Sequence, residues 1–262
     1  MNRKILNKEE INKIKAIAFD LDGTVYFGNT LADGVAELTI FLKNRGIKVF
    51  YFTNNSAKSR EDIFNKLKEL GLELLLDEVY NSAYATAIYA KENGFRKVYC
   101  VGSKGLIKEL ELRGITVLPN EEQAEVVIVG LDMEFDYNKI AKALNGIKKG
   151  CRLIACNRDR NYPVGNNAVL PGCGPLVAAI EYASGIEADC VIGKPNTYML
   201  ELLAKDHRLR NDEILVVGDT YDSDIEMAKR YKSPSILILN NSVYDACDTM
   251  LLNETKDLKS IF

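Results

Sequence analysis

The chain has 262 residues, of which 47% are hydrophobic and 27% charged, so it can bury one large core or two modest ones and is neither disordered nor fibrous. Its 34 Lys and Arg against 37 Asp and Glu give a net charge of -3, and no basic block suits nucleic acid or an anionic membrane. We therefore expect a globular protein that binds neither nucleic acid nor membrane and attracts any anionic ligand locally.

Residues 1–15 lack the apolar core of a secretory signal, and no segment approaches the roughly eighteen apolar residues of a membrane span, so we expect a cytoplasmic protein. The sequence contains six cysteines: Cys100, Cys151, Cys156, Cys173, Cys190 and Cys247. They form no Cys-x-x-Cys pair, and we expect reduced packing residues. The single histidine, His207, is expected at a solvated helix end, which argues against Ser-His-Asp and Cys-His catalysis.

The first predicted strand opens the segment AIAFDLDGTVY, residues 16–26, and its apolar start is typical of a strand buried on both faces. Asp20 and Asp22 follow, and side chains two residues apart in an extended chain point the same way. A calcium loop starting at Asp20 would need Gly at its sixth position and Glu at its twelfth, where the chain has Val25 and Leu31. An ordinary acidic turn remains an alternative.

Further along the chain, short β-branched or aromatic runs alternate with helical patterns. The predicted strands cover residues 47–54, 97–102, 124–130, 151–157, 189–195, 213–219 and 234–240. The helical patterns cover residues 58–71, 82–94, 138–150 and 174–185. Each pattern closes with a glycine, the common residue at a helix C-cap. The alternation predicts a parallel α/β architecture, and the lack of a long linker predicts that any second domain is an insertion.

Four predicted strands end in polar residues at the carboxyl edge of the sheet, where ligands of open α/β sheets bind. These residues are Asp20 and Asp22, then Thr53, Asn54 and Asn55, then Lys194, and finally Asp219 with Asp224. A carboxylate that attacks a phosphate ester faces repulsion between anions, so the site must supply a divalent cation and hydrogen-bond donors. Asp20 and Asp219 could chelate magnesium, and Lys194 could reach a phosphate as a point charge.

Two of these residues also have ordinary structural readings. Lys194 could be a solvated surface lysine, since lysines are mostly exposed. In the functional interpretation, by contrast, Pro195 would set the turn and Asn196 would cap the next helix, which leaves Lys194 free to reach a phosphate. Asp224, expected near a first helical turn, could serve only as a helix cap.

The segments DLDGT, TNN, GKP and GD....D, in this order, resemble the four signature motifs of the haloacid dehalogenase-like superfamily of aspartate-nucleophile phosphatases. The long stretch between TNN and GKP resembles the branch with an α/β cap inserted there, which comprises nitrophenylphosphatases, phosphoglycolate phosphatases and sugar phosphatases. Residues 155–164 and 170–185 also resemble that cap. The resemblance implies a doubly wound, Rossmann-like parallel-sheet core over residues 1–81 and 184–262, with an inserted α/β cap domain over residues 82–183.

The same resemblance implies a magnesium-dependent phosphatase whose partner is a small phosphorylated metabolite. Asp20 would be the nucleophile that forms an aspartyl-phosphate, and Asp22 would protonate the leaving oxygen and then activate water. Mg²⁺ would be held by Asp20, the backbone carbonyl of Asp22, and Asp219. The phosphoryl group would be bound by Gly23, through close backbone approach, and by Thr53, Asn54 and Lys194. Asp224 would orient these groups, and Ser223 stands where threonine is more usual.

Substrate choice is expected in the cap, because the four motifs bind only the phosphoryl group and the metal. Residues 157–167 form a predicted loop in which Arg158, Asp159 and Tyr162 offer charge, hydrogen bonds and a ring. A solvated connection is the alternative for this loop. The natural substrate stays open, as do a phosphotransferase, a non-catalytic phospho-ligand sensor, and a homo-oligomer formed through the cap.

Overall fold

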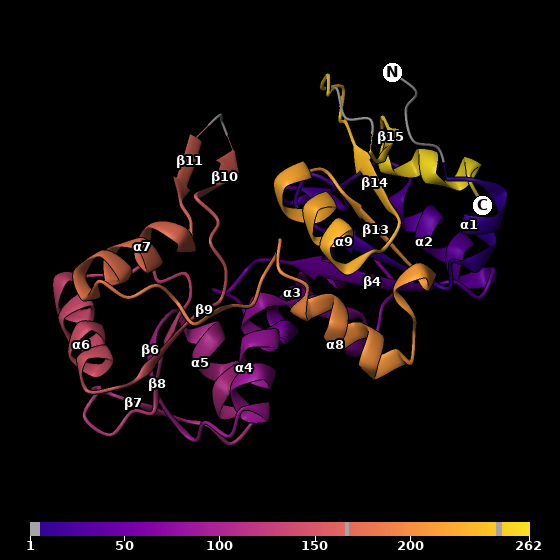
Figure 1. Ribbon diagram of the computed structural model, residues 1–262. Helices are drawn as coiled ribbons and strands as arrows, with labels where there is room; N and C mark the ends of the chain where they lie inside the picture. The colour runs from indigo at the N-terminus through magenta and orange to yellow at the C-terminus, as the bar shows by residue number, and fades with distance from the viewer. Residues whose placement is uncertain (1–5, 166–167, 245–247) are drawn as a thin grey trace. The chain divides into compact units, whose positions relative to one another are not determined.

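The computed structural model describes residues 6–165, 168–244 and 248–262, and the chain divides into two compact units. Unit 1 comprises Met1–Thr53, Phe64–Tyr80 and Lys194–Phe262. Unit 2 comprises Asn54–Ile63 and Asn81–Gly193. Because unit 1 resumes after unit 2, the second unit is an insertion in the chain of the first (Figure 1).

Unit 1 is built on a parallel sheet. Its strands are β1 (Ala16–Asp20), β4 (Lys48–Thr53), β5 (Val79–Asn81), β13 (Ile214–Gly218), β14 (Ser235–Ile238) and β15 (Met250–Leu252). Among the described residues they form one six-stranded sheet in the order β15-β14-β13-β1-β4-β5. β1 pairs in parallel with β4 and β13, and β14 pairs in parallel with β13 and β15. The order runs outward from β1 in both directions, so the sheet is doubly wound and the predicted fold class is confirmed.

The helices of unit 1 lie before or between these parallel strands in the chain. They are α1 (Lys8–Lys13), α2 (Val35–Asn44), α8 (Tyr198–His207), α9 (Glu226–Tyr231) and the second half of α3 (Arg60–Glu69). Shorter helical turns span Leu76–Glu78, Asn211–Glu213, Tyr221–Ile225 and Thr255–Ser260, and a small hairpin joins β2 (Tyr26–Phe27) to β3 (Thr30–Leu31). Residues Ala16 to Phe19 are at most 1% exposed, which confirms that β1 is buried on both faces.

Unit 2 has a parallel sheet of its own. Its strands are β6 (Lys97–Val101), β7 (Thr116–Leu118), β8 (Val126–Val129), β9 (Arg152–Ala155) and β12 (Cys190–Val191). They lie in the order β12-β9-β8-β6-β7, with parallel pairing throughout. Its helices are the start of α3, α4 (Ser82–Glu92), α5 (Lys104–Glu111), α6 (Tyr137–Lys148) and α7 (Cys173–Ser184).

Helices cover both faces of the unit 2 sheet. Ala143 and Ile147 of α6 and Val177 of α7 pack with Val127 and Val129 of β8 in one buried cluster. Helices α4 and α5 lie on the opposite side of the strands in Figure 1. Since both faces are covered, each residue of β8 is buried whichever way it points.

The structure corrects the interpretation of residues 157–167 as a loop. Asn161–Gly165 form β10, which pairs antiparallel with β11 (Ala168–Pro171), and residues 166–167 lie outside the described part of the chain. Tyr162 lies opposite Leu170 in this hairpin. Aromatic and β-branched residues favour strands, which the polar character of the segment obscured.

The boundaries of the two units also differ from the expected ones. Unit 2 continues to Gly193 rather than ending at residue 183, because β12 pairs in parallel with β9. Residues Asn54–Ile63, expected in the core, belong to unit 2 as well.

Two expectations about α8 are wrong. The N-cap position is held by Thr197 and not by Asn196, because the helix begins one residue later than expected, at Tyr198. His207 is the last residue of α8, but it is half-buried rather than solvated, since its ring lies 4.4 Å from that of Phe50 between centroids. Its Nε2 lies 3.3 Å from the Tyr80 hydroxyl. His207 is therefore part of the packing beside β4 and β5.

The described cysteines are all free thiols, as expected, and Cys247 lies outside the described residues. Burial raises the pKa of the Cys156 thiol to about 12, so this thiol stays protonated. Within the described chain, none of the helices combines the length and the apolar character needed to cross a membrane.

Candidate active site

The candidate active site lies at the carboxyl end of β1, the strand from which the order of the unit 1 sheet runs outward in both directions. Phe19 of β1 lies opposite Val217 of β13 in the parallel register. Asp20 ends β1 and Asp219 follows the last residue of β13, so the two acids leave neighbouring strands at the same edge. Ligands of doubly wound sheets bind outside the carboxyl ends of the strands at this point of reversal.

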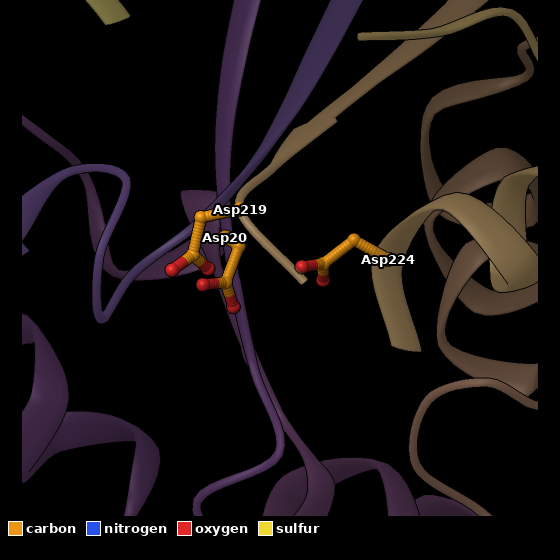
Figure 2. A group of neighbouring side chains, drawn as sticks. All are labelled: Asp20, Asp219 and Asp224. Carbon is orange, nitrogen blue, oxygen red and sulfur yellow. The ribbon is translucent and has the colours of Figure 1, made fainter. Parts of the chain in front are cut away.

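Three carboxylates gather at this edge. Asp20, Asp219 and Asp224 each offer an oxygen, and these oxygens lie within 4.8 Å of one another (Figure 2). Asp224 comes from the π-helical turn Tyr221–Ile225 that follows β13, and it is 1% exposed. Its side chain is thus buried beside the other two acids, and its Oδ2 also accepts from the N–H of Thr220, at the start of the same turn, at 3.2 Å.

Lys194 is buried among these acids. Its side chain is 3% exposed, its ammonium contacts Asp20, and it donates to Oδ1 of Asp224 at 2.6 Å. Burial alone would lower the pKa of Lys194, but the carboxylates of Asp20 and Asp224 raise it overall, so the amine is charged. The alternative of a solvated surface lysine is therefore wrong.

Two acids of the cluster, Asp20 and Asp219, have a pKa above that of a free carboxyl. Burial raises the pKa of Asp20 well above its ordinary value, with Lys194 opposing the shift and the other two acids adding to it. Burial, followed by repulsion from Asp224, raises the pKa of Asp219 to about 6. One lysine does not neutralise three acids, so the cluster has the charge and the hard oxygen donors that favour a divalent cation.

Gly23 lies directly against Asp219. Its φ is +86°, and a Cβ at this position would lie 2.0 Å from Oδ2 of Asp219. The Gly23 N–H donates to the carbonyl of Tyr26 at 2.9 Å, and the Gly23 carbonyl accepts from Nδ2 of Asn240 at 2.7 Å. The Gly23 N–H is therefore used within the turn, and the missing side chain leaves space beside Asp219; a close approach of this backbone to a phosphoryl group stays a prediction.

Asp22 stands apart from the three clustered acids. Its side chain is exposed, and its Oδ2 accepts a hydrogen bond from the Tyr26 hydroxyl at 2.9 Å. Neither Tyr26 nor Asn240 was identified from the sequence. The only signal for Tyr26 was its position in the same turn as Asp22.

Thr53 and Asn54, which are neighbours in the TNN motif, belong to different units. Thr53 is the last residue of β4 in unit 1 and is 6% exposed. Asn54 begins the first segment of unit 2, where its Nδ2 donates to Oδ1 of Asp159 at 2.8 Å. The Asn54 carbonyl accepts from Oγ of Ser82 at 2.6 Å and from Nδ2 of Asn157 at 2.7 Å. The side-chain Nδ2 and the backbone carbonyl of Asn54 thus both have hydrogen-bond partners in unit 2.

The three residues expected to select substrate have different hydrogen-bond partners. Arg158 is ion-paired with Glu181, and its Nη1 lies 2.9 Å from Oε2 of that residue. Asp159 accepts from Asn54, as described above. The Tyr162 hydroxyl lies 3.5 Å from the sulfur of Met133.

Comparison with known proteins identifies the family. A model described as haloacid dehalogenase-like hydrolase matches residues 17–116, and a second, HAD-hydrolase-like, matches residues 191–257. The acid sugar phosphatase of Staphylococcus saprophyticus is 36% identical over 212 residues, which is 80% of this chain and 81% of that protein. The chain belongs to the haloacid dehalogenase-like hydrolases.

Other members of this hydrolase family confirm the predicted branch. Phosphoglycolate phosphatase 2 of Arabidopsis thaliana is 31% identical over 256 residues, covering 88% of this chain and 85% of that protein. The solved structure of a p-nitrophenyl phosphatase from Archaeoglobus fulgidus matches with a TM-score of 0.88 at 29% identity, covering 95% of this chain and 99% of that one. The chain is thus a haloacid dehalogenase-like phosphatase that hydrolyses phosphate esters.

Proposed function

We propose that this phosphatase hydrolyses small phosphate monoesters through an aspartyl-phosphate on Asp20, with Mg²⁺ as cofactor. The observation that carries the proposal is the group of three carboxylates within 4.8 Å of one another, with buried Lys194 against two of them. Relatives named for sugar phosphate, phosphoglycolate and nitrophenyl phosphate support this class of substrate.

The donor set fits Mg²⁺, which prefers a few carboxylates together with other oxygen ligands. Asp20, the backbone carbonyl of Asp22, and Asp219 would hold the ion, and Gly23 leaves the room beside Asp219 that a side chain would fill. Bound there, Mg²⁺ would offset the negative charge of the carboxylates and of the transferring phosphoryl group. Asp224 would not ligate, because its oxygens accept from Lys194 at 2.6 Å and from the N–H of Thr220 at 3.2 Å.

The chain's own residues would carry the two chemical steps. An oxygen of Asp20 attacks phosphorus while the carboxyl of Asp22 gives its proton to the leaving oxygen, so the alcohol departs neutral. The Asp22 carboxylate then takes a proton from water as that water attacks the phosphorus bound to Asp20. Phosphate leaves and Asp20 is regenerated. Lys194 and Thr53 would hold the phosphoryl oxygens, and Arg158, Asp159 and Tyr162 stay predictions for substrate selection.

The test is phosphate release from a panel of sugar phosphates, phosphoglycolate and nitrophenyl phosphate, with Mg²⁺ or with chelator. We expect release only with Mg²⁺, and no turnover by Asp20→Asn although the variant stays folded. Adding acceptor alcohols separates the alternatives: a phosphotransferase would form new esters, and a sensor would bind phosphate esters without releasing phosphate. Full activity in chelator, or near-normal turnover by Asp20→Asn after deamidation is excluded, would overturn the proposal.

A further inference from the structure

The turn after Asp20 folds back so that its last residue lies beside Asp22. The N–H groups of Val25 and Tyr26 donate to the carbonyl of Leu21 at 2.9 and 3.1 Å. The N–H of Gly23 donates to the carbonyl of Tyr26 at 2.9 Å. These backbone bonds fix the distance between Asp22 and Tyr26 independently of either side chain.

The two side chains have opposite environments. Tyr26 is 3% exposed, whereas Asp22 is exposed, and the Tyr26 hydroxyl donates to Oδ2 of Asp22 at 2.9 Å. An exposed aspartate ordinarily samples several rotamers, and a hydrogen bond from a buried phenol selects one of them. Burial, followed by the charge of Asp22, raises the pKa of Tyr26, so its hydroxyl remains a donor.

The ring of Tyr26 is itself held in place. The ammonium of Lys66 lies 3.7 Å from the ring centroid, which is cation–π distance. Thr255 donates to the carbonyl of Thr24 at 2.7 Å, and Asn240 donates to the carbonyl of Gly23, so the turn is anchored from the C-terminal segment as well. Contacts other than the one with Asp22 therefore hold both the Tyr26 ring and the turn that carries it.

We propose that Tyr26 is a positioning residue that aims the carboxyl of Asp22 at the leaving oxygen. The inference rests on the proposed function, in which Asp22 is the proton donor. Because Oδ2 accepts from Tyr26, Oδ1 is the oxygen that delivers the proton to the leaving group and later receives one from water. Tyr26 keeps its own proton throughout, so the step remains balanced.

The dependence of kcat on the leaving group distinguishes a positioning role of Tyr26 from a purely structural role. An alkoxide is a poor leaving group and needs the proton from Asp22, whereas nitrophenolate leaves readily without it. Tyr26→Phe should therefore lower kcat for an alkyl phosphate by roughly tenfold or more, since misplacement forfeits part of a general-acid effect of about 10²–10⁴. The KM values, and kcat for nitrophenyl phosphate, should stay within about threefold of wild type, because a lost general acid lowers kcat alone.

A matched control is Tyr51→Phe. Tyr51 is another fully buried tyrosine of unit 1, on β4, and its hydroxyl makes no hydrogen bond to the described acids of the site. This substitution should leave the ratio of the two rates unchanged. Equal losses on both substrates in Tyr26→Phe, or no loss on either, would overturn the inference.

A double-mutant cycle separates this inference from the proposed function. Asp22→Asn should show the same leaving-group dependence more strongly, and Tyr26→Phe should have little further effect in that background. If Tyr26→Phe lowers the rate as much without Asp22 as with it, the positioning role is wrong even though Asp20→Asn is inactive. If Asp20→Asn is active, the proposed function itself fails.

Discussion

Gly23 sets how closely the backbone can approach the carboxylates of the site. Its backbone has a positive φ of +86°, in the left-handed region, and a side chain there would overlap Asp219. Gly28, in the next turn, is also left-handed, with φ +60°, but nothing lies within 4 Å of its missing Cβ. The two glycines thus carry similar backbone strain on substitution and differ only in what a methyl group would displace.

Gly23→Ala should abolish Mg²⁺-dependent phosphate release, because the new methyl group displaces Asp219 from its place beside Asp20. Gly28→Ala should cost only the backbone strain, about 1–2 kcal/mol, and keep its activity while folded. Activity and thermal unfolding of both variants check this prediction. Equal activity in the two variants would show that the contact between Gly23 and Asp219 is not needed.

The raised pKa of Asp219 links stability to pH. In the unfolded chain this carboxyl titrates near 3.8, and in the folded protein near 6, so folding favours the protonated form. Without a cation, stability should therefore fall as the pH rises from about 4 to about 6 and stay lower above that. A bound cation has the opposite preference, because it needs the ionised carboxylates.

Mg²⁺ should accordingly stabilise the protein above pH 6 and have little effect near pH 4, where Asp219 is protonated. At a hundredfold excess over Kd the gain would be about 2.7 kcal/mol, visible as a higher melting temperature. Asp219→Asn should remove the gain, whereas Asp33→Asn, at an exposed carboxylate paired with Lys256, should keep it. A gain of equal size at both pH values would contradict the assignment.

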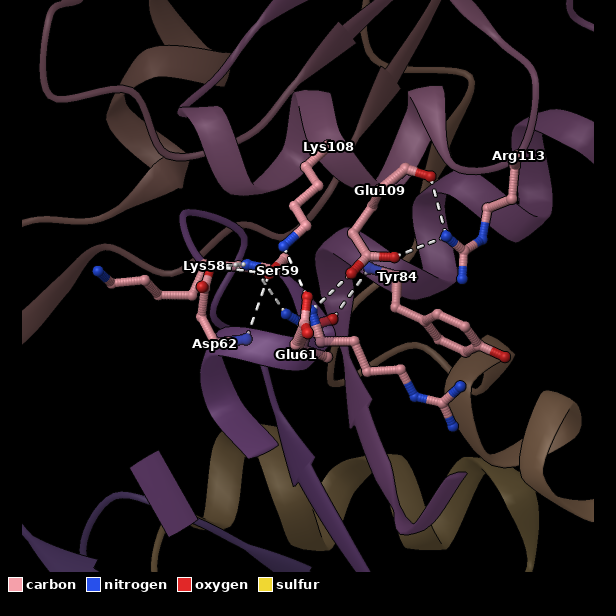
Figure 3. A network of polar contacts seen from close by, with 10 residues as sticks. Lys58, Ser59, Glu61, Asp62, Tyr84, Lys108, Glu109 and Arg113 are labelled. Atoms are coloured by element: carbon pink, nitrogen blue, oxygen red, sulfur yellow. Dashed lines mark hydrogen bonds and ion pairs between the residues drawn. The ribbon is translucent and has the colours of Figure 1, made fainter. Parts of the chain in front are cut away.

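At the scale of elements, α3 is shared by the two units, and its first turn is fixed within unit 2 (Figure 3). Oε1 of the buried Glu109, on α5, accepts from the N–H of Arg60 at 2.6 Å. Oε2 of the same residue accepts from Nη1 of Arg113 at 2.7 Å. The guanidinium groups of Arg60 and Arg113 lie 4.1 and 4.6 Å from the ring centroid of Tyr84. One carboxylate therefore joins α3 to α5.

Glu109→Ala should destabilise the protein by about 1–3 kcal/mol, because it leaves a partly buried N–H and a partly buried guanidinium without their acceptor. Lys108→Ala is the matched control, since its ion pair with Glu61 is 45% and 56% exposed and is worth only about 0–1 kcal/mol. Denaturant unfolding of both variants measures the difference. A loss for Glu109→Ala no larger than that of the control would show that α3 is held by other contacts.

The hairpin of β10 and β11 is where the predicted substrate selection can be tested. If residues 158–162 contact the leaving group, Asp159→Ala and Tyr162→Ala should change the ranking of phosphate esters by kcat/KM while Mg²⁺ dependence stays the same. Val169→Ala, at an exposed residue of β11, is the control. An unchanged ranking in both variants would place specificity elsewhere in unit 2.

Element prediction from the sequence succeeded where the pattern was local. The strand before Asp20 and the helix closed by Gly185, which has φ +70°, follow from apolar runs and a glycine C-cap. The β10–β11 hairpin could not be predicted in this way, because its strands are exposed and carry no apolar alternation. Nor could the sequence show that Asn54 bonds with Asp159, since 105 positions separate the two residues.

At the scale of the whole molecule, the site of unit 1 is assembled from distant parts of the chain. Asp20 comes from its first segment, whereas Lys194, Asp219 and Asp224 come from its last, with unit 2 inserted between them. The polar residues at the ends of the predicted strands, and then the family resemblance, predicted this grouping. The burial of Lys194 between two acids and the donor that faces Asp22 depend on tertiary packing, which no local pattern encodes.

The central claim is that Asp20 becomes phosphorylated during turnover, and chemical trapping tests it most directly. Borohydride reduces an acyl phosphate to an alcohol but leaves a free carboxylate intact, so enzyme quenched during turnover can be reduced and its peptides sequenced by mass. The Asp22→Asn variant should accumulate the intermediate, because it lacks the group that activates water. We predict that position 20 loses its carboxyl group in the presence of substrate and Mg²⁺, and keeps it in chelator. An intact Asp20 during rapid phosphate release, or a phosphoryl group on another residue, would contradict the account.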